Sequence, residues 1–169
     1  MKHSLSILVA ALPLAAWAAS SSPDAAFYKQ AAEGGMAEVE AGKMAESKAS
    51  MDSVRKFGAM MVKDHGEAND KLKGIAAGKS VKLPDSPDLK HKAMAKMMEK
   101  KAGADFDEAY IDSQVKDHQD TVALLQKEID SGKDDDAKAF AREVLPKVRQ
   151  HLKAIQDIKA GAGAHAGTH

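Results

Sequence analysis

The sequence contains no cysteine, few aromatic residues and no excess of charge of either sign. Without cysteine, disulfide bonds and thiolate ligands are excluded, so a metal would need histidine, carboxylate, methionine or backbone oxygen. The 25 basic residues balance the 25 acidic ones, which argues against a nucleic-acid binder with a basic surface. Aromatic residues make up only 4%, and the abundant alanine, lysine and methionine favour helices over a β-sandwich. We therefore expect one all-α domain.

A long apolar run is absent everywhere except near the N-terminus. There, residues 5–17 follow a short basic start, and Ala16-Trp17-Ala18 has the A-x-A form of a secretory cleavage site. We predict that residues 1–18 are a signal peptide, which places the mature protein in the periplasm or outside the cell. The run is shorter than the ~20 apolar residues of a membrane span, so no span is expected after cleavage. An uncleaved membrane anchor is the alternative.

Turn and capping signals divide the mature chain into helical segments. We expect helices at residues 24–48, 50–78, 88–100, 105–130 and 134–159. Pro87 suits the first position of the short third helix, and Asp105 with Glu108 has the form of a capping box for the fourth. The domain is expected to span residues 24–160, and residues 161–169 are predicted to be a disordered tail.

The tetrapeptide V-K-D-H occurs twice, at residues 62–65 and 115–118. Both copies lie near the middle of a long helix, in the same phase of an apolar stripe whose members alternate three and four residues apart. Such a stripe is the inward seam of a bundle helix. Four long helices and a short one in the central connection predict a four-helix bundle with a long crossover and an up, down, down, up order.

Each of the four seams carries one ionisable residue near its middle. These residues are Glu38, His65, His118 and His151. At 1.5 Å of rise per residue their levels fall within roughly 8 Å of each other. One carboxylate and three imidazoles would form a mononuclear site for Zn, Cu, Fe or Mn. The alternative is a polar layer without metal, in which the histidines hydrogen-bond their neighbours. Asp64 and Asp117 either orient the imidazoles or pair with lysines.

Four blocks in this order carry a resemblance to a known family. They are FYKQAAEGGMAEVEAGKMA (residues 27–45), VRKFGAMMVKDH (54–65), DFDEAYIDSQVKDH (105–118) and AFAREVLPKVRQHL (139–152). Together they resemble a ferritin-like, exported bacterial family, the domain of unknown function numbered 4142, over residues 27–158. The resemblance implies a ferritin-like four-helix bundle in the envelope of a Gram-negative bacterium. It brings no known activity.

The carboxylate motif of ferritin-like di-iron proteins is missing. Those proteins use Glu-x-x-His on two helices. Here Val62, Val115 and Val148 stand three residues before the seam histidines, so no seam histidine belongs to such a motif. A di-iron centre, with its oxygen chemistry, is therefore not expected.

These observations favour a protein that binds a single metal for metal handling or envelope stress, without being an enzyme. A structural module that binds an envelope protein through its bundle is one alternative. An oxidoreductase with a mononuclear metal is another. The segment HKAMAKMM at residues 91–98 resembles methionine clusters that bind Cu(I), although methionine also fills the core beneath a crossover in an aromatic-poor protein.

Overall fold

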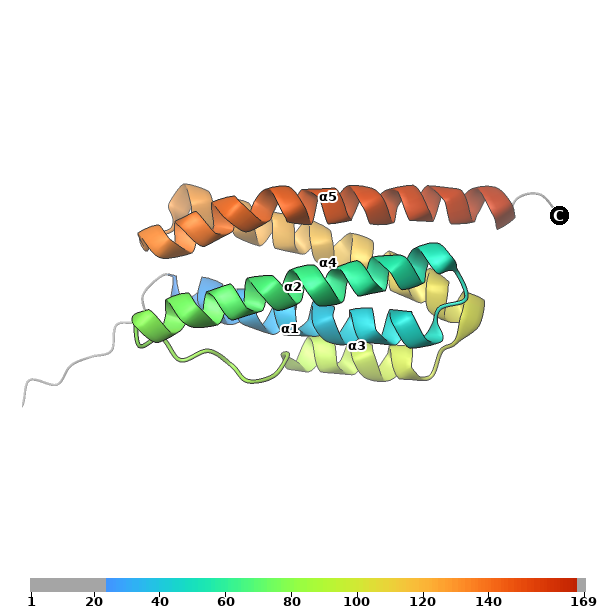
Figure 1. Ribbon diagram of the computed structural model, residues 1–169, viewed down its shortest axis with the longest axis horizontal. Coiled ribbons are helices and arrows are strands. Elements are labelled where there is room, and N and C mark those ends of the chain that lie inside the picture. The colour runs from blue at the N-terminus through green and yellow to red at the C-terminus, as the bar shows by residue number, and fades with distance from the viewer. Residues whose placement is uncertain (1–23, 167–169) are drawn as a thin grey trace, which may run out of the picture.

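The computed structural model describes residues 24–166, with side chains as far as residue 163. Within these residues the helices are α1 (Ala25–Lys48), α2 (Asp52–Gly78), α3 (Leu89–Glu99), α4 (Gly103–Ser131) and α5 (Asp135–Ala166). Figure 1 shows four long helices packed lengthwise, with the short α3 outside them along α1. The predicted all-α bundle is confirmed.

The four long helices follow the predicted up, down, down, up order. α1 and α2 form one hairpin, and α4 and α5 form the other. At one end of the bundle, Ala49 just after α1 pairs with Gly103 at the start of α4. At the opposite end, the Tyr28 hydroxyl near the start of α1 donates a hydrogen bond of 3.2 Å to Asp134, just before α5. The connection from α2 to α4 therefore crosses the whole bundle and carries α3, as expected.

Buried apolar side chains form two clusters, one toward each end of the bundle. The first contains Phe27, Tyr28, Ala32, Leu72, Leu125, Ala137, Phe140, Ala141, Leu145 and Val148. The second contains Ala45, Ala49, Val54, Phe57, Met61, Met98, Phe106, Tyr110, Ile111 and Ile155. Along each helix the buried His65, His118 and His151 lie between members of the two clusters. A polar layer therefore separates two apolar half-cores.

Two glycines bring α1 and α2 into close contact. A Cβ atom on Gly42 would lie 2.6 Å from the carbonyl oxygen of Gly58, and one on Gly58 would lie 2.7 Å from that of Gly42. Real Cβ atoms do not approach a carbonyl oxygen so closely, so any larger residue would push the helices apart. This contact fixes the spacing of the hairpin that carries Glu38 and His65.

Two helix starts differ from the sequence prediction. α4 begins at Gly103, and no side chain caps it, so the capping box predicted at Asp105 is wrong. Gly103 has a φ of 58°, which glycine adopts without a Cβ clash, and this lets the helix begin earlier. In α3 the N-cap is Asp88, whose side chain accepts a hydrogen bond of 2.9 Å from the backbone N–H of His91. Pro87 therefore precedes the helix.

The last helix is longer than predicted. α5 runs to Ala166, beyond the expected end at residue 159, and includes most of the segment predicted as a disordered tail. Ala162 packs against the second apolar cluster, which gives the added turns a place in the core. The predicted signal peptide and residues 167–169 lie outside the described residues. Between residues 24 and 166, no helix combines the length and the apolarity that crossing a membrane requires.

A buried aspartate fixes the turn between α1 and α2. The Asp107 carboxylate of α4 accepts hydrogen bonds from the backbone N–H groups of Ser50 (3.1 Å) and Met51 (2.9 Å), and also from the Ser50 hydroxyl. Only 3% of Asp107 is exposed. This carboxylate therefore satisfies backbone donors that the turn leaves free.

The opposite end of the bundle buries two carboxyl groups together. Asp24 accepts a hydrogen bond of 2.8 Å from the backbone N–H of Lys133, which ties the start of α1 to the α4–α5 turn. Glu128 of α4 lies beside it, and the Glu128 Oε1 atom has no hydrogen-bond partner among the described residues, so a proton on Glu128 could bond to Asp24. Desolvation, with the contact to Asp24, raises the pKa of Glu128 from 4.5 to about 7.

Candidate metal centre

Three histidines from three different helices meet in the middle of the bundle. His65 comes from α2, His118 from α4 and His151 from α5, and each is at most 7% exposed. Their ring centroids form a nearly equilateral triangle with sides of 5.5, 5.6 and 5.7 Å. One nitrogen from each ring lies within 4.8 Å of the other two. The sequence prediction that these three seam positions share a level is therefore correct.

Phe57 forms one wall of this histidine triad. It lies on α2 two turns before His65, and its ring meets His118 edge-on at 6.0 Å and His151 edge-on at 6.5 Å between centroids. Both contacts are edge-to-face, with interplanar angles of 62° and 79°, an arrangement that aromatic rings favour. Phe57 belongs to the second apolar cluster, so this cluster borders the triad on that side.

Hydrogen bonds fix the orientation of two of the rings. The Nδ1 atom of His118 lies 2.9 Å from the backbone carbonyl oxygen of Gln114, one turn earlier in α4. The Nε2 atom of His151 lies 2.9 Å from a carboxylate oxygen of Asp64 in α2. Because a carbonyl and a carboxylate can only accept here, both ring nitrogens carry the proton. The remaining nitrogen of each ring then has a free lone pair.

The free nitrogens are the atoms that a metal would bind. His65 Nε2, His118 Nε2 and His151 Nδ1 are buried and have no hydrogen-bond partner among the side chains that the structure describes. Desolvation lowers the pKa of His65 to about 3, with added repulsion from the other two rings, and that of His118 to about 4. His65 and His118 are thus neutral near pH 7, the form that coordinates metals. Desolvation also lowers the pKa of His151, against the opposing effect of its hydrogen bond to Asp64.

The triad fits a transition metal after a small contraction. Zn–N bonds of 2.0–2.1 Å in a tetrahedral site place ligand nitrogens about 3.4 Å apart. Since one nitrogen from each ring lies within 4.8 Å of the other two, the rings would have to draw together by no more than about 1 Å each. Rotations about the side-chain bonds can provide a movement of this size without a change of backbone.

Asp64 both orients an imidazole and pairs with a lysine, the two roles that the sequence left open. Besides His151 it contacts the Lys147 ammonium group at 3.0 Å across the α2–α5 interface. Burial would raise the pKa of Asp64, but the hydrogen bonds from His151 and Lys147 outweigh it and hold the pKa below its ordinary value. Asp117, at the equivalent place in the second V-K-D-H, lies elsewhere, in a small pocket under α3.

Glu38 does not join the three histidines. Its carboxyl group accepts a hydrogen bond of 2.8 Å from the Gln114 side chain, and its other oxygen lies 3.9 Å from His118 Nδ1, a nitrogen already committed to a carbonyl. Desolvation raises the pKa of Glu38 from 4.5 to about 8, against the opposing effect of the Gln114 hydrogen bond. Glu38 is therefore protonated at pH 7 and faces the opposite side of His118.

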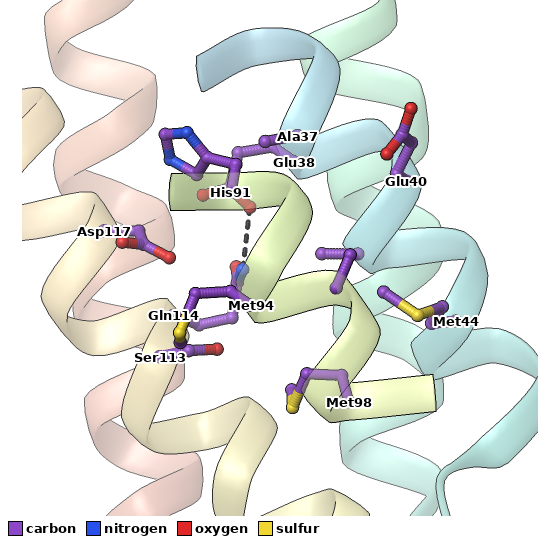
Figure 2. Close-up of a pocket in the computed structure, with 12 residues that line it drawn as sticks. Ala37, Glu38, Glu40, Met44, His91, Met94, Met98, Ser113, Gln114 and Asp117 are labelled. Atoms are coloured by element: carbon purple, nitrogen blue, oxygen red, sulfur yellow. Dashed lines mark hydrogen bonds between the residues drawn. The ribbon is translucent and has the colours of Figure 1, made fainter. Parts of the chain in front are cut away.

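Gln114 is the site residue that sequence reasoning missed. It lies four residues before His118 and so on the same face of α4, where its backbone orients the imidazole and its side chain holds Glu38. The helical spacing was a usable signal, because residues four apart on one helix are neighbours. Figure 2 shows the hydrogen bond between Gln114 and Glu38 beside the short helix α3.

Figure 2 also shows the methionine-rich pocket under α3, lined by Met44, Met94 and Met98 together with His91. The His91 ring turns back to Asp88, with 3.0 Å between Nδ1 and the carboxylate. The three labelled sulfur atoms do not point toward a common centre in this view. The pocket therefore matches the core-packing interpretation of the methionines better than a Cu(I) site.

A larger pocket reaches the triad from the surface. It has a volume of about 270 Å³, lies between α2 and α5 and opens onto His65 and His151. Ala68, Val144 and Val148 give it an apolar wall. Two ion pairs cross it, one between Lys71 and Glu143 and one between Lys147 and Asp64. An ion could reach the imidazoles by this route.

The fold and the site define a class, that of all-α bundles with a buried histidine triad at mid-height. The chain matches the family described as Domain of unknown function (DUF4142) over residues 9–158, and it belongs to that family. No curated protein and no solved structure matches the chain. The family resemblance found in the sequence is thereby confirmed, whereas the ferritin-like and exported characters stay predictions.

Proposed function

We propose that this protein binds one transition-metal ion in its core through His65, His118 and His151. The observation that carries the proposal is the convergence of three buried imidazoles, with one nitrogen from each ring within 4.8 Å of the other two. Each ring also has one buried nitrogen without a hydrogen-bond partner among the described residues. Unpaired buried polar atoms are costly, and a metal would satisfy all three at once. Partners such as the Asp64 carboxylate and the Gln114 carbonyl are typical of metal-binding histidines.

The donor set narrows the choice of metal. Three imidazole nitrogens suit Zn, Cu or Fe, whereas Mn prefers carboxylate oxygen. With Glu38 held by Gln114 away from the triad, the nitrogen donors have no carboxylate ligand beside them. We therefore rank Zn and Cu before Fe, and Mn last. A carboxylate-bridged di-iron centre is not supported by this set.

The biological setting is part of the proposal. The predicted signal peptide at residues 1–18 supports export to the periplasm of a Gram-negative bacterium, where the bundle would handle a metal or act in envelope stress. The mass of the mature protein from a native host tests this directly. Cleavage after Ala18 supports export, and an intact N-terminus contradicts it.

The competing function is that of a structural or protein-interaction module with a polar layer and no metal. A thermal melt of chelator-stripped protein, with and without Zn, Cu, Mn and Fe, distinguishes the two, beside elemental analysis of untreated protein. A metal at 100 times its Kd stabilises the fold by about 2.7 kcal/mol. We expect one metal per chain and a rise in Tm of several degrees.

Matched histidine substitutions make this test specific. His118→Ala should remove both the bound metal and the metal-dependent rise in Tm. His91→Ala, on α3 outside the triad, should change neither. If no metal is found and no ion raises the Tm of the wild-type protein, the proposal fails and the polar-layer function takes its place.

A further inference from the structure

The triad supplies only three protein ligands. The two acidic side chains in contact with the histidines are engaged, since Glu38 is held by Gln114 and Asp64 bonds to His151 and Lys147. Within the described part of the chain, no further histidine or carboxylate joins the group of three. A tetrahedral ion bound here would keep one coordination position for a ligand from outside, as three-ligand zinc sites do.

The pocket between α2 and α5 is the place from which such a ligand would come. It opens onto His65 and His151 but not onto His118, so the free position would face the pocket. Its volume of about 270 Å³ exceeds by several times the ~30 Å³ share of one water molecule, which leaves room for a small molecule. The apolar wall of Ala68, Val144 and Val148 limits competing hydrogen bonds from water.

The charge of the pocket changes sign when a divalent metal binds. Its lining carries three acidic side chains, Asp64, Glu67 and Glu143, and two ammonium groups, Lys71 and Lys147, which gives these five residues a formal net charge of −1. This negative lining favours approach of a cation. Adding a charge of +2 gives +1, and an uncompensated positive charge beside an apolar wall is costly. An incoming anion would neutralise it.

We propose that the metal-loaded triad binds one small monovalent anion, of the size of azide or acetate, as its fourth ligand in the pocket between α2 and α5. The inference rests on the proposed metal site. Lys147 belongs to the lining of this pocket, where its ammonium group contacts the Asp64 carboxylate that also bonds to His151 Nε2. It therefore supplies positive charge to the pocket through which the anion would enter.

Cobalt(II) in the full mature chain makes the test visible, because its absorption reports the ligand set. Azide titrated into the cobalt-loaded protein should change the spectrum in a saturable way, with one azide per cobalt. Cobalt content after the titration should be unchanged. Failure of cobalt to bind would contradict the metal site itself and with it this inference. Bound cobalt with a spectrum that azide does not alter would overturn only the anion site.

Variants locate the anion. Lys147→Met should raise the Kd for azide at least fivefold, whereas Lys153→Met, the same change at an exposed α5 lysine paired with Asp157, should leave it unchanged. Ala68→Leu should fill the pocket and abolish the azide response while cobalt still binds. If azide binds all three variants as it binds the wild-type protein, the anion lies elsewhere and the proposal is wrong.

Discussion

The α1–α2 turn and the histidine triad both bury polar groups, but they satisfy them differently. At the turn, the Asp107 carboxylate receives three donors from two adjacent residues. At the triad, three ring nitrogens point into the core with no partner among the described residues. Asp107 and the three histidines are each at most 7% exposed. The two regions thus represent a completed polar network and an incomplete one.

This difference separates structural polar groups from groups suited to a ligand. A completed network stabilises the fold and gains nothing from an added ion. An incomplete network lowers the stability of the free protein, and a ligand that completes the network restores that stability. The carboxyl pair of Asp24 and Glu128 is intermediate, because it is complete only while a proton is shared. Substitutions in the three places should therefore have different signatures.

The largest effect is expected at the completed network. Asp107→Ala removes the acceptor of two backbone N–H groups and one hydroxyl, and should lower the free energy of unfolding by about 3 kcal/mol. Denaturant unfolding with and without metal measures it. Metal should not reduce the loss, because the turn is far from the triad. Asp105→Ala, at an exposed position of α4, is the control, and a similar loss there would contradict the assignment.

A smaller effect is expected at Asp64, the carboxylate that holds the His151 ring of the triad in place. Asp64→Asn keeps an oxygen for His151 but removes the negative charge, and should weaken metal binding about tenfold. Calorimetric titration with Zn measures the change. Asp70→Asn, at an exposed α2 position paired with Lys73, should leave the affinity unaltered. Equal affinities for all three proteins would show that Asp64 only pairs with Lys147.

A still smaller change tests whether the triad is incomplete in the free protein. His65→Leu removes a buried nitrogen that has no partner, so the metal-free protein should keep its stability or gain up to about 1 kcal/mol while losing metal binding. His118→Leu also breaks the contact with the Gln114 carbonyl and should be less stable than His65→Leu. A loss above about 2 kcal/mol in metal-free His65→Leu would favour the polar-layer function instead.

The fold could be predicted because the seams are periodic. The three-four spacing of apolar residues placed His65, His118 and His151 at one level, and the long central connection determined the direction of the second hairpin. The helix ends were harder, since a capping pattern such as Asp105 with Glu108 competes with a glycine conformation that the sequence does not specify. Packing of Ala162 likewise extended a helix that composition alone would end.

The sequence predicts the height of each site residue along its helix, but not which neighbouring residue its side chain contacts. Spacing gives the height of a side chain along a helix, but not which way it turns. Glu38 and the three histidines share a height, yet the Gln114 amide holds the carboxyl group on the far side of His118. The two V-K-D-H copies diverge for the same reason, because α2 packs against α5 at Asp64 while Asp117 lies under α3. The contacts of these side chains depend on how the helices pack, which spacing along a single helix does not specify.

The last predicted effect concerns the pH dependence of the Asp24–Glu128 pair. The folded pKa of Glu128 is about 7 and its ordinary value 4.5, so the folded state binds more protons than the unfolded state between these values. Its contribution to stability is therefore full below pH 4.5 and is lost as the pH rises to about 7. Glu128→Gln stays neutral and can still donate to Asp24. The Tm of the wild-type protein, relative to this variant, should fall by several degrees across that window and then stay level.

Thermal melts of both proteins at five pH values from 4.5 to 8.5 measure this difference. The same substitution at the exposed Glu108 of α4 is the control and should give a difference that does not vary with pH in this way. All melts are done in the presence of a chelator. The triad then stays free of metal, and any pH dependence of the histidines affects the Tm of each protein equally. A difference between wild type and Glu128→Gln that is constant from pH 4.5 to 7 would mean that the pair shares no proton. Glu128 would then be a buried carboxylate whose Oε1 atom has no hydrogen-bond partner among the described residues, unlike Asp107 with its three donors.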